Sequence, residues 1–152
     1  MDTNTKRVPI TVTASMFTEL EILGKATGLG RSGVARIMII DGAAKIKREG
    51  LDISEIEEEL AEEWERETKF TIDVYLPRGV WFFLKMLSDA YLIPMSWLCA
   101  ILIKRGLKLA RSGELKLSID VAQEILKLFE TDEKAAEMYE KMHGGASRVG
   151  GG

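Results

Sequence analysis

The sequence predicts a mainly α-helical protein with one short two-stranded antiparallel ribbon, formed by two strand–helix–helix repeats that pair within the chain as a pseudo-dimer. Apolar and polar residues alternate over 7–13 and again over 70–76, which is typical of half-buried strands. Each strand is followed by two helical periodicities that meet at a short turn. A lone strand would leave its backbone groups unpaired, so each strand is predicted to pair with the other. A domain-swapped dimer is the competing arrangement, because the linker allows either.

The alternation gives each strand an inner and an outer face. The residues expected to pack under the ribbon, against the four repeat helices, are Val8, Ile10, Val12, Phe70, Ile72 and Val74. The opposite face carries Arg7, Pro9 and Thr11 from one strand and Thr71, Asp73 and Tyr75 from the other. Pro9 has no N–H group, so we expect its edge to lie away from the ladder.

Helix-capping signals and composition divide the chain. We assign a first repeat (1–50), an acidic linker helix (51–67), a second repeat (68–115), C-terminal helices (116–143) and a disordered glycine-rich tail (144–152). The predicted caps are Thr13 or Ser15 for the first helix, Ser32 and Ser96 for the second helix of each repeat, and a capping box of Ser54 with Glu57 for the linker.

The charge is distributed in blocks that the total of -3 conceals. The net charge is +3 over 1–50, -8 over 51–67, +5 over 68–117 and -3 over 118–152. Both repeats are therefore basic, and the segments between and after them are acidic. A solvated linker helix is the favoured interpretation of 51–67, and a mimic of DNA charge that occupies a basic surface in the absence of DNA is the alternative.

Several features that could indicate catalysis or cofactor binding have simpler explanations. The motif GLGRSG (28–33) lies between two helices, whereas a dinucleotide-binding loop follows a strand. The single Cys99 and the single His143 have no partners at metal-ligand or catalytic spacing. The sequence therefore predicts no enzyme, no cofactor, no metal site and no small-molecule ligand. It also shows no signal peptide and no membrane span, so we expect a cytoplasmic protein.

The order strand, helix, polar turn, helix resembles the ribbon-helix-helix superfamily of DNA-binding regulators, of the Arc, MetJ and CopG type. The stretch RVPITVTASMFTELEILGKATGLGRSGVARIMI looks like a CopG-type unit, and FTIDVYLPRGVWFFLKML is closer to the MetJ-like form. The two copies cover roughly 7–48 and 69–112, and two units in one chain resemble the tandem regulators of some archaeal viruses and plasmids. A viral origin would place the protein in the host cytoplasm.

The resemblance implies sequence-specific binding of double-stranded DNA, with the ribbon in the major groove. By that resemblance, the base-reading residues are Arg7, Pro9, Thr11, Thr71, Asp73 and Tyr75. Phosphates would be bound at the N-termini of the second helices and by nearby cations, through Lys6, Arg31, Ser32, Gly33, Lys69, Ser96 and Trp97. Pro9 and Asp73 depart from the usual polar or basic triplet of the family.

We therefore expect a transcriptional regulator acting as a repressor, with cooperative self-association through its C-terminal helices. Two alternatives from other classes remain open. One is an antitoxin-like autoregulator whose C-terminal helices bind a protein partner. The other is an oligomerisation or partner-binding module that has lost DNA binding, as the acidic linker and Asp73 would allow.

Overall fold

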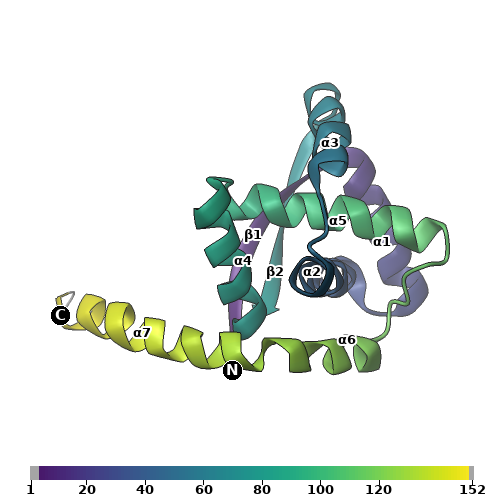
Figure 1. Ribbon diagram of the computed structural model, residues 1–152. Helices are drawn as coiled ribbons and strands as arrows, with labels where there is room; N and C mark the ends of the chain where they lie inside the picture. Colours follow the sequence, from purple (N-terminus) through teal and green to yellow (C-terminus); the bar gives the residue numbers. More distant parts are fainter. Residues whose placement is uncertain (1–3, 151–152) are drawn as a thin grey trace.

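The computed structural model describes residues 4–150, with side chains described over residues 4–143. The protein is mainly helical, with one two-stranded antiparallel sheet. The elements in chain order are β1 (Thr5–Thr13), α1 (Ala14–Thr27), α2 (Gly30–Glu49), α3 (Ser54–Arg66), β2 (Lys69–Pro77), α4 (Arg78–Tyr91), α5 (Met95–Arg111), α6 (Ile119–Leu126), the 3-10 turn η1 (Lys127–Phe129) and α7 (Glu130–Gly150). The order strand–helix–helix thus occurs twice, with α3 between the two occurrences (Figure 1).

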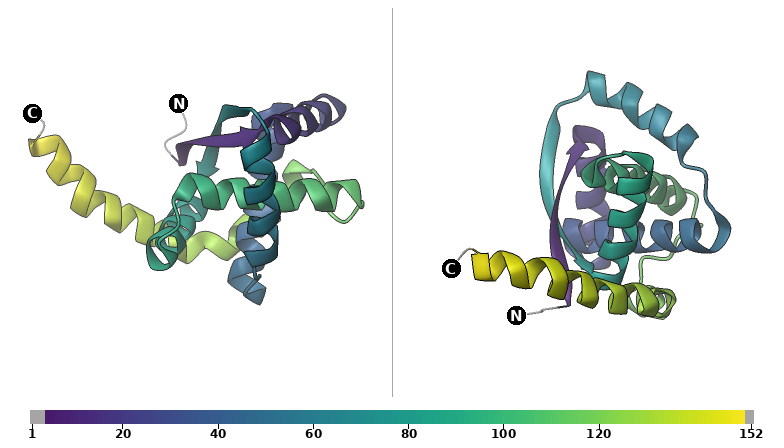
Figure 2. Two further views of the ribbon diagram at one scale, coloured as in Figure 1. Left: turned by 90° about the horizontal axis from the view of Figure 1, so that it is seen from above. Right: turned by 60° about the vertical axis from the view of Figure 1, so that its left-hand side comes forward.

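The two strands pair with each other, as the alternation predicted. The register is antiparallel and places Pro9 opposite Asp73, with Thr5 opposite Pro77 at one end and Thr13 opposite Lys69 at the other. The ribbon lies along one side of the molecule, and the helices lie behind it (Figure 2). One face of the ribbon is therefore covered by the helices, and the other is left to solvent.

The covered face of the ribbon contributes to a single hydrophobic core. Its buried side chains are Val8, Ile10, Val12, Ile72, Val74 and Leu76. Phe70 was predicted to belong to this set, but it is 41% exposed. It lies near the end of β2, where its ring stacks on Phe17 of α1 at 4.7 Å between centroids instead of entering the core. Leu76 takes the corresponding buried place at the other end of the strand.

Helices α2 and α5 cross at the centre of the core, and two glycines allow their close approach. A Cβ atom on Gly106 would lie 2.4 Å from Cγ of Met38, and one on Gly42 would lie 2.8 Å from Cδ2 of Leu102. Both distances are shorter than a van der Waals contact, so any larger side chain would push the helices apart. The contact is reciprocal, because each helix supplies one glycine and one large apolar residue.

The helix starts differ in part from the predicted caps. Thr13 does cap α1, since its side chain accepts a hydrogen bond from the N–H of Met16 at 3.2 Å. Helix α2 begins at Gly30 after Leu29, and α5 begins at Met95 after Pro94, so Ser32 and Ser96 lie inside the first turn and do not cap. The prediction failed because a serine inside the first turn gives the same sequence signal as a serine that precedes it.

The predicted capping box of the linker is also wrong. Helix α3 begins after Ile53, and both the N–H and the hydroxyl of Ser54 donate to Oδ1 of Asp52, at 3.0 and 2.7 Å. The Glu57 carboxylate instead accepts a hydrogen bond from Nε1 of Trp97 on α5, at 2.7 Å. A tertiary contact has replaced the local cap.

Helix α3 packs on the body of the protein and is more than a solvated linker. Leu60 is fully buried, and Trp64 meets Trp97 edge to face at 5.1 Å between ring centroids. Its glutamates contact α5, where Lys104 donates to Glu63 at 2.6 Å and Lys108 donates to Glu59 at 2.8 Å. The acidic helix thus neutralises lysines of α5.

The C-terminal helices also join the core. Phe129 and Ala136 are buried, and a Cβ atom on Gly79 would lie 2.6 Å from the carbonyl oxygen of Phe129, so α4 touches η1 closely. Helix α7 then runs away from the body (Figure 1). The chain remains helical through Gly150, whereas 144–152 was predicted to be a disordered tail. Extending an existing helix needs no new nucleus, which favours continuation over a fresh start. Residues 151–152 lie outside the described part of the chain.

Within residues 4–150, no single helix is long and apolar enough to span a bilayer. Helices α4 and α5 together reach the required length and hydropathy, but they are bent by 111° at the break between them.

Candidate nucleic-acid interface

The six residues predicted to read bases form one exposed face of the ribbon. They lie opposite one another in three cross-strand pairs, which are Arg7 with Tyr75, Pro9 with Asp73 and Thr11 with Thr71. Arg7 and Tyr75 project at one end of this face, where half of the Tyr75 surface is exposed. The strand alternation therefore brought together, in register, residues that are sixty or more positions apart in sequence.

Two side-chain contacts cross this face. Nε of Arg7 lies 3.2 Å from Oδ1 of Asp73, and the hydroxyls of Thr11 and Thr71 lie 3.4 Å apart. The Arg7 and Asp73 side chains remain 58% and 49% exposed. An ion pair this exposed is worth at most about 1 kcal/mol, so a competing partner can displace it.

The two lysines predicted to contact phosphates lie on opposite faces of the ribbon. Lys69 shares the exposed face of β2 with Thr71 and Asp73, and its ammonium lies 5.5 Å from the ring of Trp64. Lys6 belongs to the covered face, where it pairs with Glu140 of α7 at 2.9 Å and lies 5.3 Å from the Trp81 ring. Only Lys69 is therefore placed beside the base-reading residues.

The N-terminus of α2 lies against the ribbon. The hydroxyl of Ser32 donates to the main-chain oxygen of Asp73 at 2.7 Å, which places Gly33 and the first turn of α2 next to the centre of β2. Arg31 in the same turn pairs with Glu21 at 2.7 Å and stacks over the Phe17 ring at 4.5 Å, with 42% of its side chain exposed. This end of α2 combines main-chain N–H groups, the positive end of a helix dipole and one arginine.

The N-terminus of α5 has different surroundings. Ser96 and Trp97 lie in its first turn, and the Trp97 side chain is occupied by contacts with Glu57 and Trp64 of α3. Carboxylates of α3 would repel a phosphate at this end. The N-termini of α2 and α5, which were both predicted to bind phosphate, therefore have different surroundings in the structure.

One relationship that the sequence analysis missed connects the two strand–helix–helix units. Pro9 and Asp73 face each other in the ribbon, and Arg105 of α5 binds Asp41 of α2 at 2.8 Å; in both pairs the residue numbers differ by 64 (73 − 9 and 105 − 41). The reciprocal glycine contacts of α2 and α5 obey the same offset. Gly28 and Leu92, which lie in the two turns between helices, are also 64 positions apart, and both have positive backbone φ angles (77° and 56°). Aligning the chain with itself at this offset would have revealed the relationship.

A second missed feature is the network that anchors α3 to the end of the ribbon. The hydroxyl of Thr13 donates to Glu63, and Glu63 also accepts from Lys104. The Ser15 hydroxyl and N–H both donate to Glu67 at 2.7 Å, and these bonds hold the pKa of Glu67 below its ordinary value. Lys108 lowers the pKa of Glu59 in the same way. Glu59, Glu63 and Glu67 of the α3 segment therefore all accept hydrogen bonds, from residues of α5, β1 and α1.

The described residues hold no group of three or more histidine, cysteine or acidic side chains able to bind a metal ion. Burial raises the pKa of the Cys99 thiol to about 12, so at neutral pH it stays protonated and unreactive. His143 lies at the end of the described side chains, with its ring 4.3 Å from that of Tyr139.

Comparison of the chain with models of protein families, with curated proteins and with solved structures found no significant match.

Proposed function

We propose that the protein is a transcriptional regulator that binds specific double-stranded DNA by placing the exposed face of its β1–β2 ribbon in the major groove. The observation that carries the proposal is the in-register face formed by Arg7, Thr11, Thr71 and Tyr75 with Pro9 and Asp73 at its centre. A two-stranded ribbon fits the major groove of B-DNA, where each base pair presents a distinct pattern of donors and acceptors. We further propose that binding represses transcription.

In this proposal the two strand–helix–helix units form a ribbon-helix-helix pseudo-dimer within one chain. The offset of 64 supports it, because the pairs Pro9 with Asp73 and Asp41 with Arg105 are the contacts expected where a pseudo-two-fold axis passes. Residues on such an axis meet their own equivalents.

Arg7 is the strongest candidate for base recognition. A bidentate arginine contact with guanine is worth about 1–3 kcal/mol of discrimination, whereas the exposed ion pair with Asp73 offers at most about 1 kcal/mol. Exchanging the ion pair for guanine is therefore favourable. The hydroxyls of Thr11 and Thr71 can donate, accept or contact a thymine methyl.

Phosphate contacts are proposed at the N-terminus of α2, through Ser32, Gly33 and Arg31, and at Lys69 on the ribbon. A phosphate there would compete with Glu21 for Arg31, across an ion pair that is exposed and therefore weak. Lys6, Ser96 and Trp97 contribute little in this proposal, because α7 and α3 occupy their side chains or their surroundings.

The test is a mobility-shift titration on a pool of random duplexes and on sequences selected from it, at two salt concentrations. The double variant Arg7→Ala/Thr11→Ala should lose the preference for selected sequences and retain weak, salt-sensitive binding to any duplex. The matched control is Arg48→Ala/Thr18→Ala, which removes the same residue types from exposed positions on helices α2 and α1. The control should bind as the wild type does.

Equal loss in both double variants would contradict base reading by the ribbon, because it would trace binding to charge alone. Absence of binding by the wild-type protein at low salt would reject the whole proposal.

One set of contacts favours a second candidate, a module that binds a protein partner and not DNA. Cations on or near the proposed surface pair with carboxylates of the same chain, as in Arg7 with Asp73 and Arg31 with Glu21. Met138 and Met142 are 65% and 69% exposed on α7, which projects from the body. An apolar partner of α7, as in an antitoxin-like protein, would then be the ligand to seek.

A further inference from the structure

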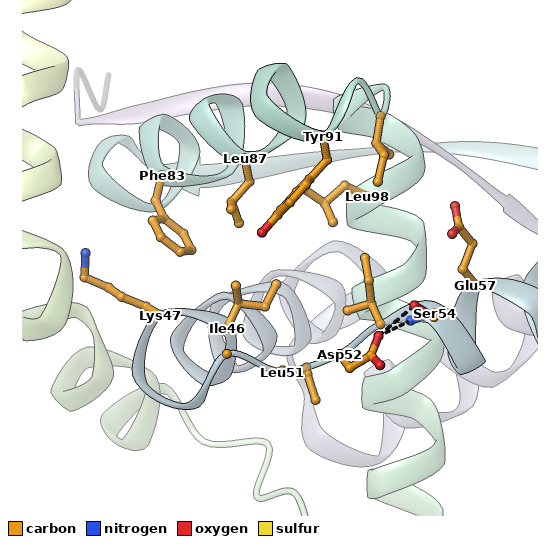
Figure 3. A pocket seen from close by; sticks show the side chains of 13 residues that line it. Ile46, Lys47, Leu51, Asp52, Ser54, Glu57, Phe83, Leu87, Tyr91 and Leu98 are labelled. Carbon is orange, nitrogen blue, oxygen red and sulfur yellow. Dashed lines mark hydrogen bonds between the residues drawn. The ribbon is translucent and has the colours of Figure 1, made fainter.

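A hollow lies between the C-terminal half of α2, the α2–α3 connection and helix α4, and it is closed at one end by the start of α5. Its volume is about 730 Å³, which is within the range of about 300–1,000 Å³ found for small-molecule sites. Its walls are mainly apolar and include Ile46, Phe83, Leu87, Ile93 and Leu98. We call it the α2–α4 cleft (Figure 3).

The fold contains its own comparison for this cleft. The equivalent place in the other unit lies between α1 and α5, where Glu19, Leu23, Ala110 and Arg111 stand 64 residues from Phe83, Leu87, Ile46 and Lys47. There the hollow has a volume of only about 160 Å³, and two of its lining residues, Arg111 and Glu19, form an ion pair of 3.2 Å. Helices α1 and α5 therefore pack together without a large void, so the larger volume between α2 and α4 is not a general consequence of this arrangement of helices.

The α2–α4 cleft lacks the equivalent ion pair, because Phe83 stands where the other unit has Glu19. Lys47 turns to Asp132 of α7 instead, at 2.8 Å, and its ammonium lies 5.0 Å from the Phe83 ring. Lys47 lines the cleft, and its charge is neutralised there by Asp132 of α7. The interior of the α2–α4 cleft is therefore apolar and aromatic, and the one lysine in its wall is paired with a carboxylate.

Carboxylates gather at the opposite end. In Figure 3 the hydrogen-bonded pair Asp52 and Ser54 lies at the end far from Lys47, and Glu57 lies on the same side, separate from that pair. Both hydrogen bonds from Ser54 use the Oδ1 atom of Asp52, and the bond from Trp97 uses the Oε2 atom of Glu57, so the second oxygen of each carboxylate takes no part in these bonds. The C-terminal end of α2, which finishes at Gly50 in the same wall, adds the negative end of a helix dipole.

We propose that the α2–α4 cleft binds a small organic cation, an apolar or aromatic molecule with one protonated amine. The apolar part lies against Phe83, Leu87 and Ile46, and the amine lies at the end formed by Asp52, Glu57 and the α2 C-terminus. The ring of Tyr91, which is 66% exposed and points from α4 toward α2 in Figure 3, covers the ligand. This site is separate from the ribbon, and its test does not depend on DNA binding.

The test uses two fluorescent probes with the same apolar dansyl group, titrated into the full-length protein. Dansylcadaverine carries a protonated amine and dansylglycine carries a carboxylate. The cationic probe should bind with a saturable blue shift and at least about tenfold more tightly than the anionic one. Asp52→Asn should weaken the cationic probe about fivefold and leave the anionic probe unchanged.

Two variants locate the binding. Leu87→Trp fills the cleft and should abolish binding, and Tyr91→Ala, at an exposed residue whose loss leaves the core intact, should weaken it. Ile22→Trp is the control, because Ile22 is 61% exposed and lines the small hollow of the other unit. It should bind as the wild type does, and circular dichroism checks that each variant is folded. Equal affinity for both probes, no saturable binding, or unchanged binding by Leu87→Trp and Tyr91→Ala would overturn the proposal.

Discussion

The guanidinium of Arg105 donates to the carboxylate of Asp41 at 2.8 Å, and the two residues occupy the same position in the two strand–helix–helix units. Their side chains are only 10% and 14% exposed. A homodimer of one unit would place two like charges or two neutral groups at this point. The single chain can instead place opposite charges at the two positions.

This pair predicts a charge-exchange experiment. Asp41→Ala should lower the free energy of unfolding by about 3 kcal/mol, because it leaves a buried guanidinium unpaired. The exchange Asp41→Arg/Arg105→Asp should recover most of that loss, since the two positions are related by the proposed pseudo-two-fold axis. Urea unfolding of the three proteins measures both effects. An exchanged protein no more stable than the single variant would contradict the equivalence of the two positions.

Asp73 predicts a gain of DNA binding by substitution. Asp73→Asn removes the carboxylate that pairs with Arg7 and that repels phosphates, so the affinity for duplex DNA should rise about threefold to tenfold at low salt. Mobility shifts on one duplex measure the change. Asp89→Asn is the control, because Asp89 is an exposed partner of Lys85 on α4. Equal gains in both variants would assign the effect to net charge and not to the ribbon.

The attachment of α3 predicts a dependence of stability on pH. The hydrogen bonds from Ser15 hold the pKa of Glu67 below its ordinary value of 4.5. A carboxyl group whose pKa is lowered by folding contributes stability that is fully present above its unfolded pKa and is lost as the pH falls through the folded value. Glu67→Gln should therefore be less stable than the wild type at about pH 7, and the difference should be smaller at about pH 3. Urea titrations at the two pH values test this, and a difference that is undiminished in acid would contradict it.

The exposed methionines of α7 predict weak self-association. Met138→Ser/Met142→Ser should lower the mass measured by light scattering at high protein concentration and reduce cooperativity on DNA, without changing the unfolding midpoint. These point changes are preferable to deleting the C-terminal helices, because Phe129 and Ala136 belong to the buried interior. Met86→Ser on α4, a residue that is 39% exposed, is the control. A monomeric wild-type protein at all concentrations would contradict the prediction.

Local sequence patterns were sufficient to predict the ribbon and the repeat helices. Alternation over the two strands identified both faces, because a half-buried strand repeats every second residue. The signal was weaker at the element ends. Phe70 follows the alternation but lies near the strand terminus, where α1 and not the core meets it. Ser32 and Ser96 resemble caps, yet the helices begin before them.

The features that depend on tertiary contacts could not be predicted. The acidic composition of α3 indicated a solvated helix, and only the fold shows that Glu59 and Glu63 meet lysines of α5. Local sequence patterns likewise do not predict that the α2–α4 cleft is larger than the hollow between α1 and α5. It arises because Phe83 and Glu19, two ordinary helix residues, occupy equivalent places against different neighbours.

The most direct test of DNA reading by the ribbon is selection of binding sites from randomised duplexes by the wild-type protein at low salt. The two exposed strand faces differ, with Arg7, Pro9 and Thr11 on one strand and Thr71, Asp73 and Tyr75 on the other. The proposal therefore predicts enrichment of one non-palindromic sequence under each chain, and its loss with Arg7→Ala/Thr11→Ala. Enrichment of a perfect inverted repeat centred under one chain, or of no sequence at all, would contradict it.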